Sequence, residues 1–402
     1  LEAAKGKASV IEGVMGLYDG TDVKTSEGSA YEIASATDSP VLLVMPAFGV
    51  GRTIGSLILG MLADDTDRRI RGILLNGMSS SYYEKISAAL GEKIQNAGYE
   101  AKLLGCIPKI KDLKLDSRHL GLKLPHEIDD IREQIDRIAD AIEENCDVDG
   151  ILKIMQDASP ICARPDGAHS KKTSSDNSNV SAHQMPTIRT DTAPVLAIAR
   201  DEAFCFYYRE NLDRLEDAGI RLAPFSPIHD KKLPGGASGL LLGGGYPELY
   251  LPALSENTSM KEAIKEAIGS GMPAIAECGG FMYLHEQIED MQGKPYETAG
   301  VLKGICRYTG NLVNFGYVSV TDYLGKKESA FSDALPGMRG HEFHYYESTA
   351  QDGDLLLCKK TTRKTYPAMI VRDSVVFGFP HFYYGDDAFA RKLFEEMKKY
   401  GK

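Results

Sequence analysis

Short apolar runs alternate with amphipathic segments along most of this chain, and that alternation constrains its fold more than any other feature. Apolar runs at residues 40–45, 72–77 and 102–108 are each followed by a segment with apolar residues at helical spacing, the longest at 126–145. Parallel strands need such crossover connections, whereas antiparallel strands do not. The pattern therefore predicts an α/β fold built on a parallel sheet.

The alternation stops at about Ser159 and restarts at residues 194–204. Residues 159–192 are rich in Ser, Thr, Asp and Lys and lack apolar periodicity, which is typical of a flexible linker. The chain has 402 residues, enough for two domains of ordinary size. We predict one α/β domain at residues 1–158 and a second at 193–402, joined by an exposed linker.

Composition excludes several classes of protein. The formal charge of −11 argues against a nucleic-acid binder, which normally carries a basic face. The sequence contains no run of 18 or more apolar residues, so it predicts no membrane span. The seven cysteines include no CxxC pair, so neither a zinc site nor a disulfide framework is indicated. These features favour a cytoplasmic protein.

Cys278 lies where a short apolar run meets two glycines. PAIAE (273–277) is typical of a buried strand, and GGFMYLHEQI (279–288) of the helix that follows it. A side chain on such a sharp turn is pushed out of the sheet. The N-terminus of the helix, with free N–H groups and a positive dipole end, favours a thiolate. This pattern predicts an activated nucleophile; the alternative is a cysteine packed as a small hydrophobe.

A thiolate that attacks a carbonyl group needs an oxyanion hole and a base. The stretch GLLLGGGYPELY predicts a strand that ends in three glycines, where the backbone N–H groups of Gly244, Gly245 and Tyr246 would bind an oxyanion. His381 follows another apolar run and is the expected base; the alternative is a packed histidine at a strand end.

The stretch GHEFHYYE carries four residues that can bind metals, His341, Glu342, His344 and Glu347. The zinc-protease motif places its two histidines four residues apart on a helix, and these are three apart. The surrounding aromatic residues favour a strand, on which the two histidines would face opposite sides. We expect this stretch to support an interface or the substrate cleft rather than a metal.

The order of oxyanion loop, cysteine and distant histidine is that of the class I glutamine amidotransferase domain, which has a flavodoxin-like fold. The stretches LLGGGYPELY, AECGGFMYL and GHEFHYYE closely resemble the amidotransferase half of the cobyrinate a,c-diamide synthase family, and the similarity covers nearly all of residues 194–390. The resemblance implies that Cys278 attacks the amide of glutamine and that His381 acts as base and then as acid. Many class I relatives carry a Glu two residues after the histidine, where this chain has Tyr383, so what orients His381 is open.

The stretches EGVMGLYDG, GILLNGMSS and LDSRHLGL resemble the synthetase half of the same family. The resemblance implies a P-loop NTPase-like domain, related to dethiobiotin synthetase, that uses ATP as co-substrate with Mg²⁺. Glu12 would be a Mg²⁺ ligand and Asn76 would lie near the adenine. Asp19 would lie near the tetrapyrrole carboxylates, and Arg118 and His119 would face phosphates or the acidic substrate. On local grounds alone, the alternative is that Glu12 is a solvated loop carboxylate.

The family also has a P-loop, GxxxxGK[ST], ahead of the segment that contains Glu12, and the chain shows none there. FGVGRTIGS (48–56) has Arg52 where the lysine belongs and Pro46 where the first glycine belongs. The chain also begins with neither Met nor a signal peptide. We therefore expect roughly 80 residues, a P-loop-bearing βα unit with its flanks, to be missing before Leu1. The chain as written would bind ATP poorly but retain glutaminase chemistry.

The sequence thus predicts an ATP- and glutamine-dependent ligase that amidates the a and c acetates of cobyrinate through acyl phosphates, in corrinoid synthesis. One alternative is the same reaction on hydrogenobyrinate or nickel-sirohydrochlorin. Others are a form with glutaminase activity only, a non-catalytic binding protein, and a cysteine hydrolase that acts on another amide. A homodimer is compatible with the sequence.

Overall fold

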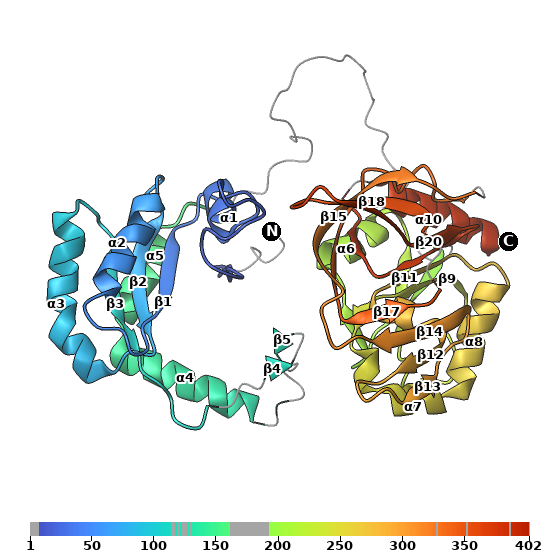
Figure 1. Ribbon diagram of the computed structural model, residues 1–402, viewed down its shortest axis with the longest axis horizontal. Helices are drawn as coiled ribbons and strands as arrows, with labels where there is room; N and C mark the ends of the chain where they lie inside the picture. Colours follow the sequence, from blue (N-terminus) through green and yellow to red (C-terminus); the bar gives the residue numbers. More distant parts are fainter. Residues whose placement is uncertain are drawn as a thin grey trace, which may run out of the picture. The chain divides into compact units, whose positions relative to one another are not determined.

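The computed structural model describes residues 8–113, 117–118, 121–122, 128, 130–160, 193–326, 329–350, 353–385 and 387–401. The chain divides into two compact units, one within Leu1–Ser175 and the other within Asp176–Lys402 (Figure 1). Residues 161–192 of the predicted linker lie outside the described residues.

The first unit is built on a three-stranded parallel sheet in the order β1-β2-β3 (Figure 1). Its strands are β1 (Val41–Pro46), β2 (Ile70–Asn76) and β3 (Lys102–Ile107). Helix α2 connects the first two strands and α3 the next two, as the alternating pattern predicts. The helices are α1 (Ala30–Ala36), α2 (Ile54–Asp64), α3 (Ser80–Asn96), α4 (Ile131–Asn145) and α5 (Val148–Gln156), and the short strands β4 (Ser117–Arg118) and β5 (Gly121–Leu122) pair with each other.

The apolar stretch that contains Glu12 is not a strand. Residues 8–28 form neither helix nor strand, and Val10, Val14 and Met15 are more than three-quarters exposed. A strand needs a neighbour to pair its backbone N–H and C=O groups. Among the described residues, β1 pairs with β2 alone. The apolar residues of VIEGVMGLYDG (10–20) predict a strand entry ahead of the glycine-containing loop, and this prediction is wrong for this structure.

The second unit is built on a six-stranded sheet in the order β20-β21-β11-β9-β6-β8, parallel except for β20. These strands are β6 (Val195–Ala199), β8 (Arg221–Phe225), β9 (Ala237–Leu242), β11 (Ala274–Glu277), β20 (Ile370–Arg372) and β21 (Val375–Gly378). The predicted α/β class with parallel sheets is thus confirmed.

Side chains alternate between the two faces of this sheet. Leu240 and Leu242 pack in one buried cluster with α7 and α8, whereas Leu241 and Ile275 pack in another with α6 and α10. Both faces are covered, which explains why the interior strands β6, β9 and β11 are almost entirely buried. The helices of the unit are α6 (Arg209–Asp217), α7 (Leu251–Glu256), α8 (Thr258–Gly269), α9 (Gly279–Tyr283), α10 (Asp387–Tyr400) and the 3₁₀ turn η4 (Pro247–Leu249).

Two further sheets flank the parallel one. The first, in the order β13-β12-β14-β17, contains β12 (His285–Glu289), β13 (Pro295–Glu297), β14 (Leu302–Tyr308) and β17 (Tyr346–Ser348). The second, in the order β19-β18-β15-β16-β22, contains β15 (Asn314–Tyr323), β16 (Arg339–His344), β18 (Leu355–Lys359), β19 (Thr365–Ala368) and β22 (His381–Tyr383). The short strands β7 (Phe204–Phe206) and β10 (Gly244–Gly245) form a separate pair.

The predicted helix over residues 279–288 is wrong in its second half. Helix α9 ends at Tyr283, and β12 begins at His285. The chain leaves the helix because the backbone of β12 finds partners on both sides, β13 and β14. Within the described ranges, every helix is too short or too polar to span a bilayer.

Candidate active site

Cys278 lies on a sharp turn between β11 and α9, with φ +47° and ψ −106°. Residues other than glycine rarely adopt a positive φ, and such strain persists only where the surroundings enforce it. Here the N–H of Cys278 donates to the Gly378 carbonyl at 2.8 Å, and the N–H of Gly280 donates to the Gly243 carbonyl at 2.9 Å. The strands on either side of β11 therefore hold the turn, which we call the elbow (residues 277–280).

The two glycines of the elbow let it pack against the loop that follows β9. A Cβ added at Gly280 would overlap the Leu242 carbonyl oxygen. A Cβ added at Gly279 would lie 2.8 Å from Pro247 Cδ and 3.1 Å from the Gly245 nitrogen. The elbow is therefore in direct contact with residues 243–246, which we call the glycine loop.

The glycine loop also contacts His381. A Cβ added at Gly244 would overlap His381 Cε1, with Nδ1 at 3.1 Å and Nε2 at 3.2 Å. His381 reaches this position because β22 pairs with β16, where His341 is its cross-strand neighbour. The structure thus brings the glycine loop, the elbow and the distant histidine together, although more than 100 residues separate Cys278 from His381 in the sequence.

One of the three predicted oxyanion donors is already engaged. The N–H of Tyr246 donates to the Ala203 carbonyl at 2.9 Å. The Gly245 nitrogen lies beside Gly279, whose own N–H donates to the Cys278 sulfur. The other two predicted donors, Gly244 and Gly245, pair with β7 and contact the predicted catalytic segments.

Burial raises the pKa of the Cys278 thiol to about 12, and the nearby Glu248, Glu277 and Glu342 carboxylates add to the rise. The hydrogen bond from Gly279 N–H opposes it. Burial thus opposes the thiolate that the helix N-terminus was predicted to favour, and α9 has only five residues to supply a dipole.

Burial lowers the pKa of His381 to about 4, and the neighbouring His341 and His344 lower it further. At neutral pH the site therefore holds a neutral thiol and a neutral imidazole. A neutral imidazole can accept a proton, so His381 is suited to act as a general base toward a thiol that ionises only on attack.

Sequence reasoning missed Glu277, the residue immediately before the predicted nucleophile Cys278. It is 6% exposed, and its Oε2 lies 4.0 Å from His381 Nδ1. Burial raises its pKa to about 7, opposed by hydrogen bonds from the Phe382 N–H and the Tyr384 hydroxyl. The signal was visible in the sequence, because an acidic residue ends an otherwise apolar buried strand.

The stretch GHEFHYYE forms β16 and β17, as its aromatic residues predict. His341 is half-buried and His344 is buried, which places them on opposite faces of β16. The His344 ring stacks on Phe379 with a centroid distance of 3.9 Å. In the described part of the chain, no group of three or more His, Cys, Asp or Glu side chains is placed to hold a metal ion.

The residues predicted to bind ATP, Mg²⁺ and the tetrapyrrole lie in different segments of the first unit. Asn76 ends β2, whereas Glu12 and Asp19 are exposed in the segment before α1. Among the described residues, no hydrogen bond or ion pair joins these three to one another. Arg118 lies in β4, but its side chain is outside the described part of the structure, and so is all of His119.

The buried histidines predict acid sensitivity. His344 and His381 both have a pKa lowered from 6.5 to about 4, so folding keeps them neutral. Their contribution to stability is complete above about pH 6.5 and is lost as the pH falls toward 4, by about 3 kcal/mol for each histidine. Urea unfolding of the wild type between pH 7 and 4.5 should show this loss, and His344→Gln should show a shallower one. Equal pH slopes for the two proteins would contradict the prediction.

The comparisons with known proteins identify the family. Residues 195–381 match the CobB/CobQ-like glutamine amidotransferase domain. The chain is 34% identical to cobyrinate a,c-diamide synthase of Caldanaerobacter subterraneus over 385 residues, which is 94% of this chain and 78% of that protein. It is 37% identical to cobyrinate a,c-diamide synthase of Picrophilus torridus over 94% of this chain and 77% of that protein. The chain belongs to the cobyrinate a,c-diamide synthase family.

Members of this family are amidating ligases that use glutamine, and the second unit is the glutamine amidotransferase part. The resemblance found in the motifs is thus confirmed over both units. Among solved structures, PurLQS from Thermotoga maritima is 17% identical, with a TM-score of 0.36, and covers 52% of this chain and all of that chain.

Proposed function

We propose that this protein amidates the a and c acetate carboxylates of cobyrinate, with ATP and glutamine as co-substrates. The observation that carries the proposal is sequence identity of 34–37% over 94% of the chain to cobyrinate a,c-diamide synthases. Contact between the glycine loop, the elbow and His381 supports the assignment of the glutamine-hydrolysing half of this reaction to these segments.

The glutaminase half would begin when His381 takes the Cys278 proton as Sγ attacks the amide carbon of bound glutamine. The N–H groups of Gly244 and Gly245 would donate to the oxyanion, a kind of interaction worth about 10²–10³-fold in rate per donor. The proton on His381 would then pass to the leaving nitrogen, which releases ammonia and leaves a glutamyl thioester. Water, activated by His381, would hydrolyse the thioester to glutamate and restore the thiol.

The synthetase half would use ATP because a carboxylate does not form an amide spontaneously in water. Phosphoryl transfer to each acetate would give an acyl phosphate, and ammonia would displace phosphate from it. Mg²⁺ in such sites is usually held by one or two carboxylates together with nucleotide phosphates. A single carboxylate at Glu12 fits that arrangement, although it does not fit a metal held by protein groups alone. In this proposal Asn76 would lie near the adenine and Asp19 near the tetrapyrrole carboxylates. Arg118 and His119 would face phosphates or the acidic substrate.

We place the reaction in the cytoplasm, because the six cysteines in the described ranges are free, as a reducing compartment allows.

The test of the proposed function supplies the full chain with glutamine and ATP–Mg²⁺ and offers cobyrinate, hydrogenobyrinate and nickel-sirohydrochlorin in separate reactions. We expect the a,c-diamide of cobyrinate by mass spectrometry. Product from only one of the other tetrapyrroles would replace the substrate in this proposal, and glutamate release without any diamide would restrict the activity to the glutaminase half.

A further inference from the structure

We propose that Glu277 positions His381 and so takes the place of the carboxylate that many related amidotransferases carry two residues after the histidine. The catalytic group would then be a Cys–His–Glu set in which the acid directly precedes the nucleophile in sequence. This inference rests on the proposed glutaminase function.

Tyr383, which lies two residues after His381, points elsewhere. Its hydroxyl donates to Glu210 Oε1 on α6 at 2.6 Å, and that contact is exposed to solvent. Glu210 in turn pairs with Arg214 at 3.4 Å. The position that supplies the third residue in related enzymes therefore belongs to a surface network here.

The carboxylate of Glu277, the first residue of the elbow, instead faces the imidazole of His381. Its Oε2 lies 4.0 Å from His381 Nδ1, and the side chains of Glu277 and His381 are only 8% and 14% exposed. The other nitrogen, Nε2, is thereby left on the side of the ring away from the acid. A separation of 4.0 Å is longer than a hydrogen bond, but hydrogen bonds in unliganded active sites are often long and tighten when the substrate binds.

The carboxylate is fixed by the same strand that carries His381. Oε1 of Glu277 accepts from the Phe382 N–H at 3.2 Å and from the Tyr384 hydroxyl at 3.2 Å. Asn211 locks this strand in turn, since its Nδ2 donates to the Phe382 carbonyl at 2.7 Å and its Oδ1 accepts from the Tyr384 N–H at 2.8 Å. One oxygen of Glu277 therefore anchors the acid, and the second faces the imidazole.

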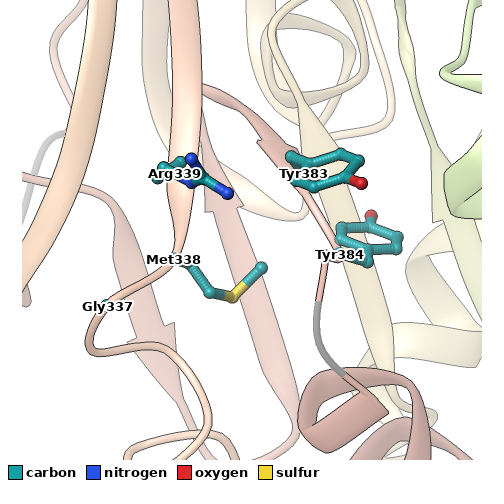
Figure 2. A pocket seen from close by; sticks show the side chains of 6 residues that line it. Gly337, Met338, Arg339, Tyr383 and Tyr384 are labelled. Atoms are coloured by element: carbon teal, nitrogen blue, oxygen red, sulfur yellow. The ribbon is translucent and has the colours of Figure 1, made fainter. Parts of the chain in front are cut away.

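Tyr384 also lines a surface pocket beside β22, together with Gly337, Met338, Arg339, Tyr383 and Gly385 (Figure 2). Cys278 and His381 do not line this pocket, so it is not the glutamine site. The rings of Tyr383 and Tyr384 lie at its wall (Figure 2), although Tyr384 itself is buried.

Burial of the Glu277 carboxylate destabilises the folded protein, but it suits the carboxylate to stabilise an imidazolium beside it. It raises the pKa of Glu277 to about 7, so ionisation of the acid falls within the physiological range. When His381 accepts the thiol proton, an ionised Glu277 would stabilise the resulting cation. The titratable groups that face this pair are Cys278, Tyr207, Tyr208, Tyr384, His341 and His344.

The test compares Glu277→Gln with Tyr383→Phe in the full chain. Glutamine keeps the size of the side chain and an oxygen for Phe382 and Tyr384, but it removes the charge. We expect kcat for glutamate release to fall at least about tenfold in E277Q, with KM within about twofold, and the rise of activity around pH 7 to disappear. Tyr383→Phe should leave both constants and the pH profile unchanged.

A second readout does not depend on glutamine turnover. The rate of iodoacetamide alkylation of Cys278, followed on its peptide by mass spectrometry, should fall at pH 7 in E277Q and shift to higher pH. We expect this because the loss of imidazolium stabilisation outweighs the relief of the minor repulsion by which Glu277 raises the pKa of Cys278. Y383F should match the wild type. If the wild type releases no glutamate, the proposed function fails, and the alkylation profile still tests Glu277. Identical alkylation profiles for E277Q and the wild type would overturn the inference.

A purely structural role for Glu277 predicts a different result. It predicts that E277Q unfolds at a lower temperature, with a pH profile of unchanged shape. We expect E277Q to unfold at or above the wild-type temperature at pH 8, because an amide is easier to bury than a carboxylate. If E277Q does not fold, Glu277→Asp carries the test: its shorter side chain should lower the alkylation rate at pH 7, and a wild-type rate would refute the role.

Discussion

Replacing Cys278 with Ser should lower the rate of glutamate release from glutamine by on the order of 10⁴-fold or more, as loss of a nucleophile does in other acyl-transfer enzymes. A serine hydroxyl at the elbow would be a much weaker nucleophile toward an amide when a neutral His381 is its only base. Initial rates of glutamate formation by the wild type and C278S measure the effect.

The fold should survive this change, because serine differs from cysteine by one atom and the elbow is held through backbone hydrogen bonds of Cys278 and Gly280. Cys358→Ser is the matched control, since Cys358 is a half-buried free thiol on β18. It should turn over glutamine like the wild type. C278S should also retain amidation when ammonia is supplied, if the synthetase half is active. Undiminished glutamine hydrolysis by C278S would show that another group is the nucleophile.

Replacing Gly280 with Ala should be the most damaging single change to the elbow. The added Cβ would overlap the Leu242 carbonyl oxygen, a backbone atom in the interior strand β9 that cannot move without breaking sheet pairing. Overpacking and backbone displacement of this kind cost about 3 kcal/mol. For a unit of this size, we expect the melting temperature to fall by roughly 6–12 °C, with loss of glutaminase activity.

Gly269→Ala is the control for this prediction. Gly269 is the last residue of α8, and a Cβ there would meet no atom within 4 Å. Alanine should stabilise the helix by up to about 1 kcal/mol, so the melting temperature should stay the same or rise. A G280A protein as stable and active as G269A would mean that the packing of the elbow against β9 is not as described.

The sequence was most informative where one local pattern decides the structure. The interior strands β6, β9 and β11 could be predicted from apolar runs because both of their faces are buried. The turn at Cys278 could be predicted because two glycines follow a strand, and a second glycine is needed against Leu242.

Features that depend on distant residues could not be predicted. Helix α9 stops after five residues because β12 pairs with β13 and β14, and neither pairing is visible in residues 279–288. The stretch around Glu12 has the apolar residues of a strand, but pairing decides whether a strand forms.

The pKa of Cys278 is the clearest example of a property that depends on distant residues. The helix-dipole rule predicts a low pKa for Cys278, but the pKa is raised by burial and by Glu248, Glu277 and Glu342, which come from three separate elements. The acid that faces His381 does not lie at the position two residues after the histidine, where this chain has Tyr383, but directly before Cys278. Its contact with His381 depends on the pairing of β22 with β16.

The most direct test of the chemistry assigned to the elbow is capture of the covalent intermediate. Wild-type protein is mixed with isotopically labelled glutamine, quenched with acid within the first turnovers, digested and mapped by mass spectrometry. The mechanism predicts a labelled glutamyl thioester on the peptide that contains Cys278, absent in C278S. Label on another residue, or steady glutamate release with no label on Cys278, would contradict it.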